Sequence, residues 1–255
     1  ANGILAGQAF LAAPADGHTL YLTVSSGHVS LNLLMQAPFD VMADFKPVAM
    51  IGTSTALLCV PAFSPSNTIA EFVAYARANP ARLNYLNPGN GTGPHLLAEM
   101  LKIKFGLDVT SVSYKGFPPG LQDLLAGRLD LGSISTTLVI QHVKAGRLKA
   151  IGLVGPRRLR ELPDVATLAE QGVGDVDVRA SFPLYGHKNL PDAIADRLNR
   201  AIIAAQGDAE ASKRLAAAYI EPLALDRSGT AAALQREYER LRSMIEQLGI
   251  KADGT

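Results

Sequence analysis

The chain has 255 residues, which is enough for one large or two modest domains with a substantial interior. Apolar residues make up 48% and charged residues 18%, a balance typical of a globular chain rather than a disordered one. A formal net charge of +1 without any run of Lys and Arg excludes a strongly basic nucleic-acid surface, and no apolar stretch approaches the length of a membrane span.

The residue types that bind metals or act as thiol nucleophiles are sparse. Cys59 is the one cysteine, so the chain cannot form an internal disulfide or a Cys-based metal site. It lies in an apolar run and is predicted to be a buried hydrophobe. The histidines show no metal-ligand spacing: His18, His28, His95, His142 and His187. We therefore expect no metal and no cofactor.

Strand-like and helix-like segments alternate along the chain, which predicts an α/β fold with a mainly parallel sheet. In the first half, helices are predicted over 4–12, 29–35, 69–78 and 95–104, and strands over 19–24, 47–51, 56–60, 83–86 and 109–114. The strands over 47–51 and 56–60 are interpreted as a pair. In the second half, helices are predicted over 120–126, 137–144, 162–172, 191–206, 209–218 and 230–248, and strands over 129–134, 149–154 and 180–185.

The last predicted helix carries one apolar stripe: Leu234, Tyr238, Leu241, Ile245 and Leu248. The stripe is too short for a convincing coiled coil, although a dimer is the alternative. We expect the helix to pack against its own domain.

The first residues read as a Gly-rich turn that opens a helix. A parallel α/β domain normally starts with a strand, a loop and a crossover helix, a unit of roughly 30 residues. We expect the natural protein to carry an upstream strand, a helix and an export signal. Without them the first domain is expected to be poorly stable, because stability is a small difference between large opposing contributions.

The strongest local signal lies in residues 83–99, where a strand runs through a Gly- and Asn-rich loop into a helix with Pro94 in its first turn. The first N–H groups of a helix lack intrahelical partners and lie at the positive end of its dipole. The glycines within 89–93 let the backbone approach a ligand closely. We predict an anion site held by backbone N–H groups and the Thr92 hydroxyl; the alternative is a simple turn and helix cap.

A nucleotide site is disfavoured at this loop. Gly89 and Gly91 begin a dinucleotide fingerprint, but Pro94 occupies the third glycine position and no Gly-Lys-Ser/Thr follows. A second loop with ligand-binding character contains Ser25, Ser26 and Gly27, at the predicted carboxyl end of a strand, where ligands bind in open α/β sheets. Two such loops in separate α/β halves of the chain suggest that they bind a ligand from opposite sides.

A set of short motifs extends in order along nearly the whole chain. It comprises Pro-Ala-Asp-Gly-His-Thr-Leu (14–20), Asp-Phe-Lys-Pro-Val (44–48), Ala-Asn-Pro (78–80), Asn-Tyr (84–85), Gly-Asn-Gly-Thr (89–92) with His-Leu (95–96), Tyr-Lys-Gly (114–116), Asp-Leu-Leu-Ala-Gly (123–127), Lys-Ala-Gly-Arg-Leu (144–148) and Leu-Pro-Asp-Val (162–165) with Thr167, Glu170 and Gly172. In this set the sequence resembles the substrate-binding proteins of tripartite tricarboxylate transporters, the Bug family.

The resemblance implies a two-lobed type II periplasmic-binding-protein fold with the ligand in the interlobe cleft. One lobe would comprise 1–61 with 183–255 and the other 62–182, with crossings near Pro61 and Phe182. It also implies an exported, periplasmic, monomeric solute-binding protein that is not an enzyme. Such a protein holds a small carboxylate with ordered water and delivers it to a membrane permease; nucleic acid is not a partner.

The candidate ligand-binding residues are Ser25, Ser26, Gly27, Asn87, Gly89, Asn90, Gly91, Thr92, His95, Tyr114, Ser133, Ser135 and Phe182. The family's Gly-Gly loop after the first strand is absent. Ser133 and Ile134 stand where the family usually has an aromatic residue and Asp, Phe182 stands for Trp, and Lys188 for Pro. An ammonium group would lack a carboxylate partner at Ile134, so we predict that non-amino carboxylates bind better than aspartate or glutamate.

Two other functions are open to this sequence. A hydrolase could use Ser25, Ser26 or Tyr114, but no Gly-x-Ser-x-Gly elbow is present. Asp123 and Asp130 are assigned to a helix and a strand, so they are not expected to form an acid/base pair. The same fold also serves ligand-sensing and signalling proteins, including transcription regulators, although this sequence has no helix-turn-helix.

Overall fold

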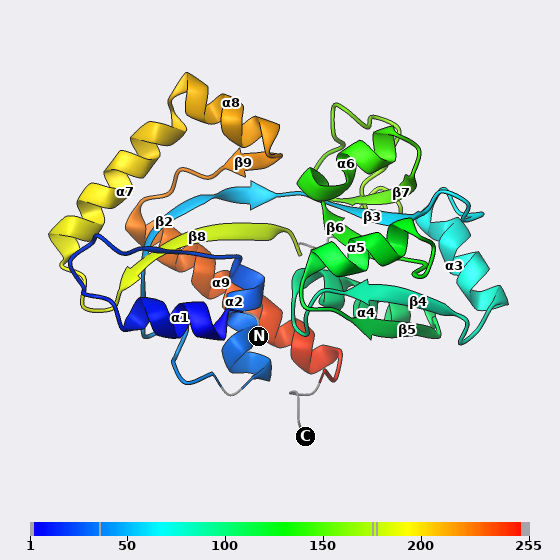
Figure 1. Ribbon diagram of the computed structural model, residues 1–255, viewed down its shortest axis with the longest axis horizontal. Helices are drawn as coiled ribbons and strands as arrows, with labels where there is room; N and C mark the ends of the chain where they lie inside the picture. The colour runs from blue at the N-terminus through cyan, green and yellow to red at the C-terminus, as the bar shows by residue number, and fades with distance from the viewer. Residues whose placement is uncertain (1–2, 36, 175, 177, 251–255) are drawn as a thin grey trace. The chain divides into compact units, whose positions relative to one another are not determined.

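The computed structural model describes residues 3–35, 37–174, 176 and 178–250 and contains two compact units (Figure 1). Unit 1 comprises residues 1–54 and 180–255, and unit 2 comprises 55–179. Helices and strands alternate through most of both, so the predicted α/β class is confirmed. None of the helices within the described ranges is both long and apolar enough to span a membrane.

Unit 1 is built around one sheet. Its elements are α1 (Ile4–Leu11), β1 (Tyr21–Leu22), α2 (Ser25–Leu34), β2 (Phe45–Ser54), β8 (Ala180–His187), α7 (Asp192–Gln206), α8 (Ala209–Ala217), β9 (Ile220–Pro222) and α9 (Arg227–Gln247). The strand order is β1-β8-β2-β9, and each neighbouring pair is antiparallel. The prediction of a mainly parallel sheet is wrong here, because β8 returns from unit 2 and runs back along β2.

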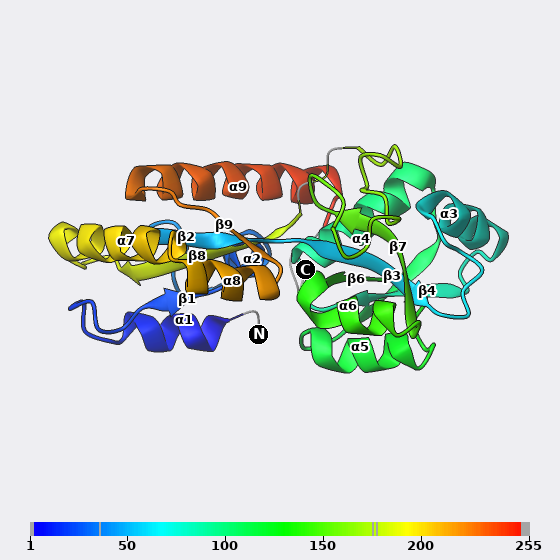
Figure 2. The same cartoon turned by 90° about the horizontal axis from the view of Figure 1, so that it is seen from above.

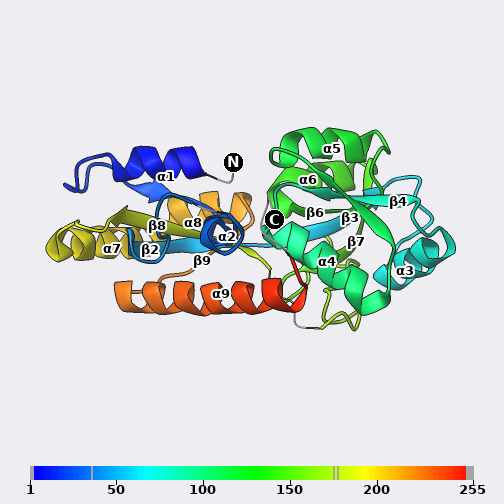
Figure 3. The same ribbon diagram turned by 90° about the horizontal axis from the view of Figure 1, so that it is seen from below.

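Helices cover both faces of this sheet: α9 lies on one and α1 on the other (Figures 2 and 3). Unit 1 has an aromatic core, in which Phe10 of α1 and Phe45 and Tyr185 of the sheet are buried in one cluster. Leu234 and Tyr238 of α9 also pack in this cluster, and Leu241 and Ile245 are buried. The stripe of the last helix therefore packs against its own unit, as predicted.

Unit 2 contains β3 (Ala56–Pro61), α3 (Ile69–Ala78), β4 (Leu83–Asn87), α4 (Gly93–Phe105), β5 (Val109–Ser113), α5 (Phe117–Leu125), β6 (Gly132–Ser135), α6 (Thr136–Lys144) and β7 (Leu148–Val154). β3 lies between β6 and β7 and is antiparallel to both, whereas β4 and β5 are parallel, so the prediction of a mainly parallel sheet is wrong for this unit too. A parallel bridge between Tyr85 and Leu131 joins the two groups of strands, with the Leu86 N–H donating to the Leu131 carbonyl at 2.9 Å.

The strands predicted over 47–51 and 56–60 do not pair. β2 pairs with β8 and β9 in unit 1, and β3 pairs with β6 and β7 in unit 2. The chain passes between units at residues 54 and 55, and again at 179 and 180, whereas the sequence placed the boundaries after 61 and 182. The first difference arises because all of β3 pairs within unit 2.

The helix predicted over 162–172 is wrong. The capping signal is real, because the Thr167 N–H donates to the Glu170 carboxylate at 2.7 Å and the Glu170 N–H donates to the Thr167 hydroxyl at 3.1 Å. The backbone on either side is instead bonded to β7, with Leu153 donating to Ala166 and accepting from Leu168. Tertiary pairing therefore replaces the helix with turns.

Candidate ligand-binding site

The Gly- and Asn-rich loop lies at the carboxyl ends of two parallel strands of unit 2. β4 ends at Asn87, α4 begins at Gly93, and Asn87 is in register with Ser113 at the end of β5. Ligands of open α/β sheets bind outside the carboxyl ends of parallel strands, where loops leave the sheet. The loop over 88–92 therefore occupies the position that the sequence predicted for a ligand-binding loop.

Asn87 holds the beginning of this loop. Its side chain is buried, with 1% of the residue exposed. The amide oxygen accepts from the Gly89 N–H at 2.9 Å, and Nδ2 faces the Asn90 Oδ1 at 2.8 Å and the hydroxyls of Ser111 and Ser113 at 3.2 and 3.4 Å. Every polar atom of the Asn87 side chain thus has a partner, which fixes the turn.

Ser111 and Ser113 were not among the predicted site residues. Both are exposed residues of β5, two positions apart, so their side chains lie on one face of the strand. The alternation of Ser and Val over 111–113 was the available signal. Their contact with Asn87 depends on the pairing of β5 with β4, which no local pattern specifies.

His95 and Thr92 hold the other end of the loop. The Gly91 N–H donates to the His95 Nδ1 at 3.2 Å, and the Thr92 hydroxyl donates to the Gly89 carbonyl at 2.7 Å. Thr92 occupies the N-cap position of α4, but its side chain accepts no N–H from that helix. The Gly89 and Gly91 N–H groups and the Thr92 proton, which we predicted to bind an anion, are therefore engaged within the loop.

The Tyr114 hydroxyl is also engaged. It donates to the Asp123 carboxylate at 2.6 Å, and burial together with this carboxylate raises the pKa of Tyr114 to about 12. The bonds from Tyr114 and Arg128 hold the pKa of Asp123 below its usual range. Asp130 accepts instead from the Asn84 N–H at 2.9 Å, so the two aspartates have different hydrogen-bond partners.

The two sides of β6 have different surroundings. Ile134 is fully buried in a core cluster with Leu57 and Leu124, whereas Ser133 and Ser135 belong to the opposite side of the strand because alternate residues point to opposite faces. The Ile134 side chain is therefore part of this core cluster. The preference for non-amino carboxylates, which we inferred from Ile134, loses its physical basis.

The Ser25–Gly27 segment of unit 1 is not a loop. α2 begins at Ser25, four residues earlier than predicted, and the Ser25 hydroxyl donates to the Glu237 carboxylate of α9 at 2.5 Å. Ser25 and Ser26 are buried, while a side chain at Gly27 would meet open space. The Ser25 hydroxyl, which we had assigned to a ligand, therefore donates to Glu237 instead.

The two other positions at which the sequence departs from the family also belong to unit 1. Phe182 is a half-buried residue of β8. Lys188 forms an ion pair with Asp44 at 2.7 Å, which accounts for its charge without a ligand.

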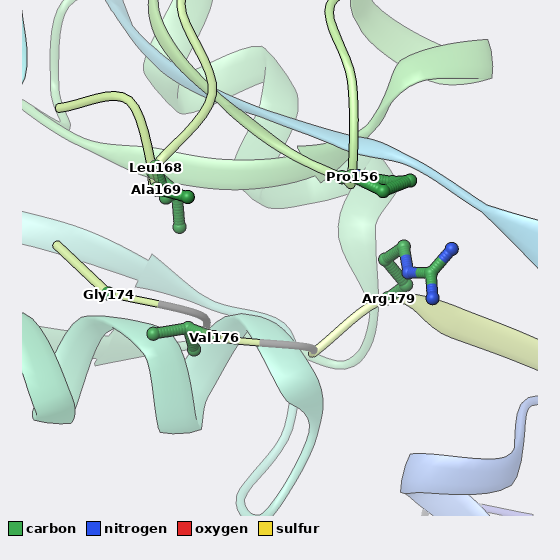
Figure 4. Close-up of a pocket in the computed structure, with 7 residues that line it drawn as sticks. Pro156, Leu168, Ala169, Gly174, Val176 and Arg179 are labelled. Carbon is green, nitrogen blue, oxygen red and sulfur yellow. The ribbon is translucent and has the colours of Figure 1, made fainter. Parts of the chain in front are cut away.

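A cavity of about 250 Å³ lies elsewhere in unit 2 (Figure 4). It is lined by Gly155, Pro156, Leu168, Ala169, Gly174, Val176 and Arg179. None of the candidate ligand-binding residues contributes to this lining. Over the described part of the chain, His, Cys, Asp and Glu side chains form no group of three or more that could hold a metal ion.

The chain matches one protein family over nearly its whole length. The family model TctC, described as tripartite tricarboxylate transporter family receptor, matches residues 1–250. A UPF0065 protein encoded in the tcbD-tcbE intergenic region of Pseudomonas sp. strain P51 is 33% identical over 218 residues, which cover 84% of this chain. The aligned region spans 65% of that relative, slightly less than two thirds of its length.

Solved structures share the fold. A structure described as a periplasmic transporter superposes with a TM-score of 0.91 over 99% of this chain and 85% of its own, at 24% identity. The Rpa4515 protein of R. palustris with adipate has a TM-score of 0.91 and 27% identity over 98% of this chain and 84% of its own. MatC of Rhodopseudomonas palustris with bound malate has a TM-score of 0.85 and 26% identity over 96% and 85%. The predicted periplasmic-binding-protein fold is confirmed.

Proposed function

The chain belongs to the tripartite tricarboxylate transporter receptor family, and we propose on this basis that it is an extracytoplasmic solute-binding protein that captures a small organic carboxylate. The family consists of transporter receptors and is not a family of enzymes. The observation that carries the choice of ligand class is the adipate complex of a relative that shares 27% identity over 98% of this chain. Malate in a second relative is also a small dicarboxylate.

The loop of unit 2 has the chemistry for one carboxylate group. Residues 87–95 contain no Lys or Arg, so a bound anion would be held by neutral donors and by the positive end of the α4 dipole. Hydrogen bonds to a carboxylate are worth roughly 1.5–3 kcal/mol each, compared with about 1 kcal/mol for neutral pairs. An incoming carboxylate can therefore exchange with internal acceptors such as the Gly89 carbonyl, which accepts from Thr92.

We assign the ligand contacts of unit 2 to Asn90, Thr92, Ser133 and Ser135. Asn87 and Tyr114, whose polar atoms are engaged with other side chains, support the loop and its surroundings. In unit 1, Ser25 becomes available only when its bond to Glu237 opens, which leaves Ser26 and Gly27 as the contacts assigned there.

The partner that fits this assignment is the membrane permease of a tripartite transporter, with the receptor acting as a periplasmic monomer. A monomer agrees with α9, because the apolar stripe that could have formed a dimer is packed in the core of unit 1.

Native mass spectrometry and a thermal-shift series test the proposal. Adipate, malate and citrate are compared with the neutral diamide of adipate, which keeps the chain length but lacks the charge. A ligand at 100 times its Kd stabilises the folded state by about 2.7 kcal/mol, so at least one carboxylate is expected to raise Tm clearly while the diamide does not. Equal Tm with every carboxylate and with the diamide, and a native mass without retained ligand, would refute carboxylate capture.

A further inference from the structure

We propose that His95 is a positioning residue of the carboxylate site, which holds the ligand-binding loop only while its Nδ1 carries no proton. Protonation of the imidazole then weakens carboxylate binding, although it adds a positive charge beside the anion. The inference rests on the proposed function of the loop over 88–92.

The geometry couples the first turn of α4 to the loop before it. His95 is the third residue of α4, 7% exposed, and its Nδ1 accepts from the Gly91 N–H at 3.2 Å. Gly91 has a φ of 75°, a left-handed conformation that glycine adopts without steric cost. The His95 ring therefore fixes the loop at the residue where the backbone turns.

The direction of this hydrogen bond determines the protonation state of the ring. A backbone N–H is always a donor, so Nδ1 must be the acceptor and the neutral ring must carry its proton on Nε2. An imidazolium ion has N–H groups at both positions and accepts no hydrogen bond. Protonation at Nδ1 would direct two donors at each other in a buried position, and the Gly91 N–H would have to move away.

The loop has two such supports, and they act on N–H groups two residues apart. Asn87 accepts the Gly89 N–H and His95 accepts the Gly91 N–H, while Thr92 closes the turn onto the Gly89 carbonyl. Loss of the His95 support frees the carboxyl half of the loop, which contains Thr92. The ligand then has to order this segment on binding, and the affinity falls accordingly.

The charges around His95 have opposite effects on its protonation. Glu99 follows one turn later on α4; burial raises its pKa, but hydrogen bonds from Tyr85 of β4 and Lys102 of α4 outweigh this and hold the pKa below the usual range. The ionised Glu99 favours an imidazolium at His95, whereas the positive end of the α4 dipole disfavours it.

A positioning role and a direct contact with the ligand predict opposite changes of carboxylate affinity with pH. If His95 were a cationic ligand contact, carboxylate affinity would rise as the pH falls through its titration. A positioning residue that must stay neutral makes affinity fall instead. The sign of the pH dependence therefore distinguishes the two roles.

Two substitutions isolate the acceptor. In His95→Asn, the Asn Oδ1 takes the place of Nδ1 as an acceptor and does not titrate. His95→Leu has the same branching at Cγ as the Asn variant but no acceptor. His142→Asn, on α6 of the same unit, is the matched control for removing a histidine.

Adipate binding is measured by calorimetry on these variants and on the wild type, over a pH range that brackets the His95 titration observed by NMR. Each affinity is divided by that of His95→Asn at the same pH, which cancels protonation of the ligand itself. The wild-type ratio is expected to start near one at high pH and to fall about tenfold as His95 becomes protonated, because a buried donor loses its partner. His95→Leu should bind adipate about tenfold more weakly than His95→Asn at every pH, and His142→Asn should follow the wild type.

NMR without ligand tests the same inference independently of carboxylate binding. The ¹⁵N shifts of the His95 ring are expected to show an unprotonated Nδ1 at high pH, and the Gly91 amide should shift with the His95 titration. A proton on Nδ1 at high pH, or a wild-type ratio that stays constant or rises as pH falls, would overturn the proposal. If no carboxylate binds at any pH, the proposed function fails, while the NMR result still decides the role of His95.

Discussion

We expect His28, a buried histidine of α2, to make the stability of unit 1 sensitive to acid. The side chain is 1% exposed and lies among the rings of Tyr21, Phe39, Phe45 and Tyr185, with centroid distances of 5.4, 6.3, 4.6 and 5.2 Å. Neither ring nitrogen has a hydrogen-bond partner within the described part of the chain. Burial in these apolar surroundings lowers the pKa of His28 from 6.5 to about 4.

The sign of the effect follows from this depressed pKa. The unfolded chain binds a proton near pH 6.5, and the folded chain does so only near pH 4. Stability is therefore complete above the unfolded value and is lost as the pH falls between the two. Each pKa unit corresponds to about 1.4 kcal/mol, so a difference of this size removes about 3 kcal/mol of unfolding free energy by pH 4.

Urea unfolding of the wild type and His28→Phe, followed from neutral pH to about pH 4, measures this loss. Phe keeps an aromatic ring of similar size and cannot take up a proton. The difference in unfolding free energy between the two proteins is expected to change by about 3 kcal/mol over this range, in favour of the variant at acid pH. Other titrating groups cancel in the difference. A difference that is constant with pH would show that His28 is not buried as a neutral ring, and the reasoning would fail.

Three further changes test other contacts. Gly91→Pro removes the N–H that His95 accepts, and adipate affinity is expected to fall about tenfold or more in calorimetry; an unchanged Kd would contradict a role for this loop. Ser25→Ala leaves the buried Glu237 carboxylate without one donor and should lower the unfolding free energy by about 2 kcal/mol in urea, whereas no loss would mean that this bond is dispensable. Leu234→Ala removes a core side chain between α9 and the sheet and should cost about 2–5 kcal/mol; a loss below 1 kcal/mol would place α9 outside the core.

Local sequence determined most of the helices and the Gly- and Asn-rich loop after β4. The helix over 69–78 was predicted with the bounds that the structure has, because Thr68 caps it and its apolar residues recur on one face. The loop after β4 was found because glycines and a proline at a helix start are local signals that need no distant partner.

Local patterns could not decide which strands pair with each other in the sheets. The sequence identified β2 and β3 as strands but paired them with each other, and it missed β9, a strand of three residues. An apolar strand satisfies its backbone equally well beside several partners. Which partner it takes depends on where β8 and β9 return, more than 100 residues later in the chain.

The use of each polar side chain was likewise decided by the tertiary structure. The sequence placed Ser25 and Ile134 in the presumed ligand pocket. In the structure, Ser25 is hydrogen-bonded to Glu237, 212 positions away, and Ile134 packs in a core built from several elements. A hydrogen-bond donor takes the acceptor that folding brings within about 3 Å, and contacts between distant segments leave no periodic signal in the sequence.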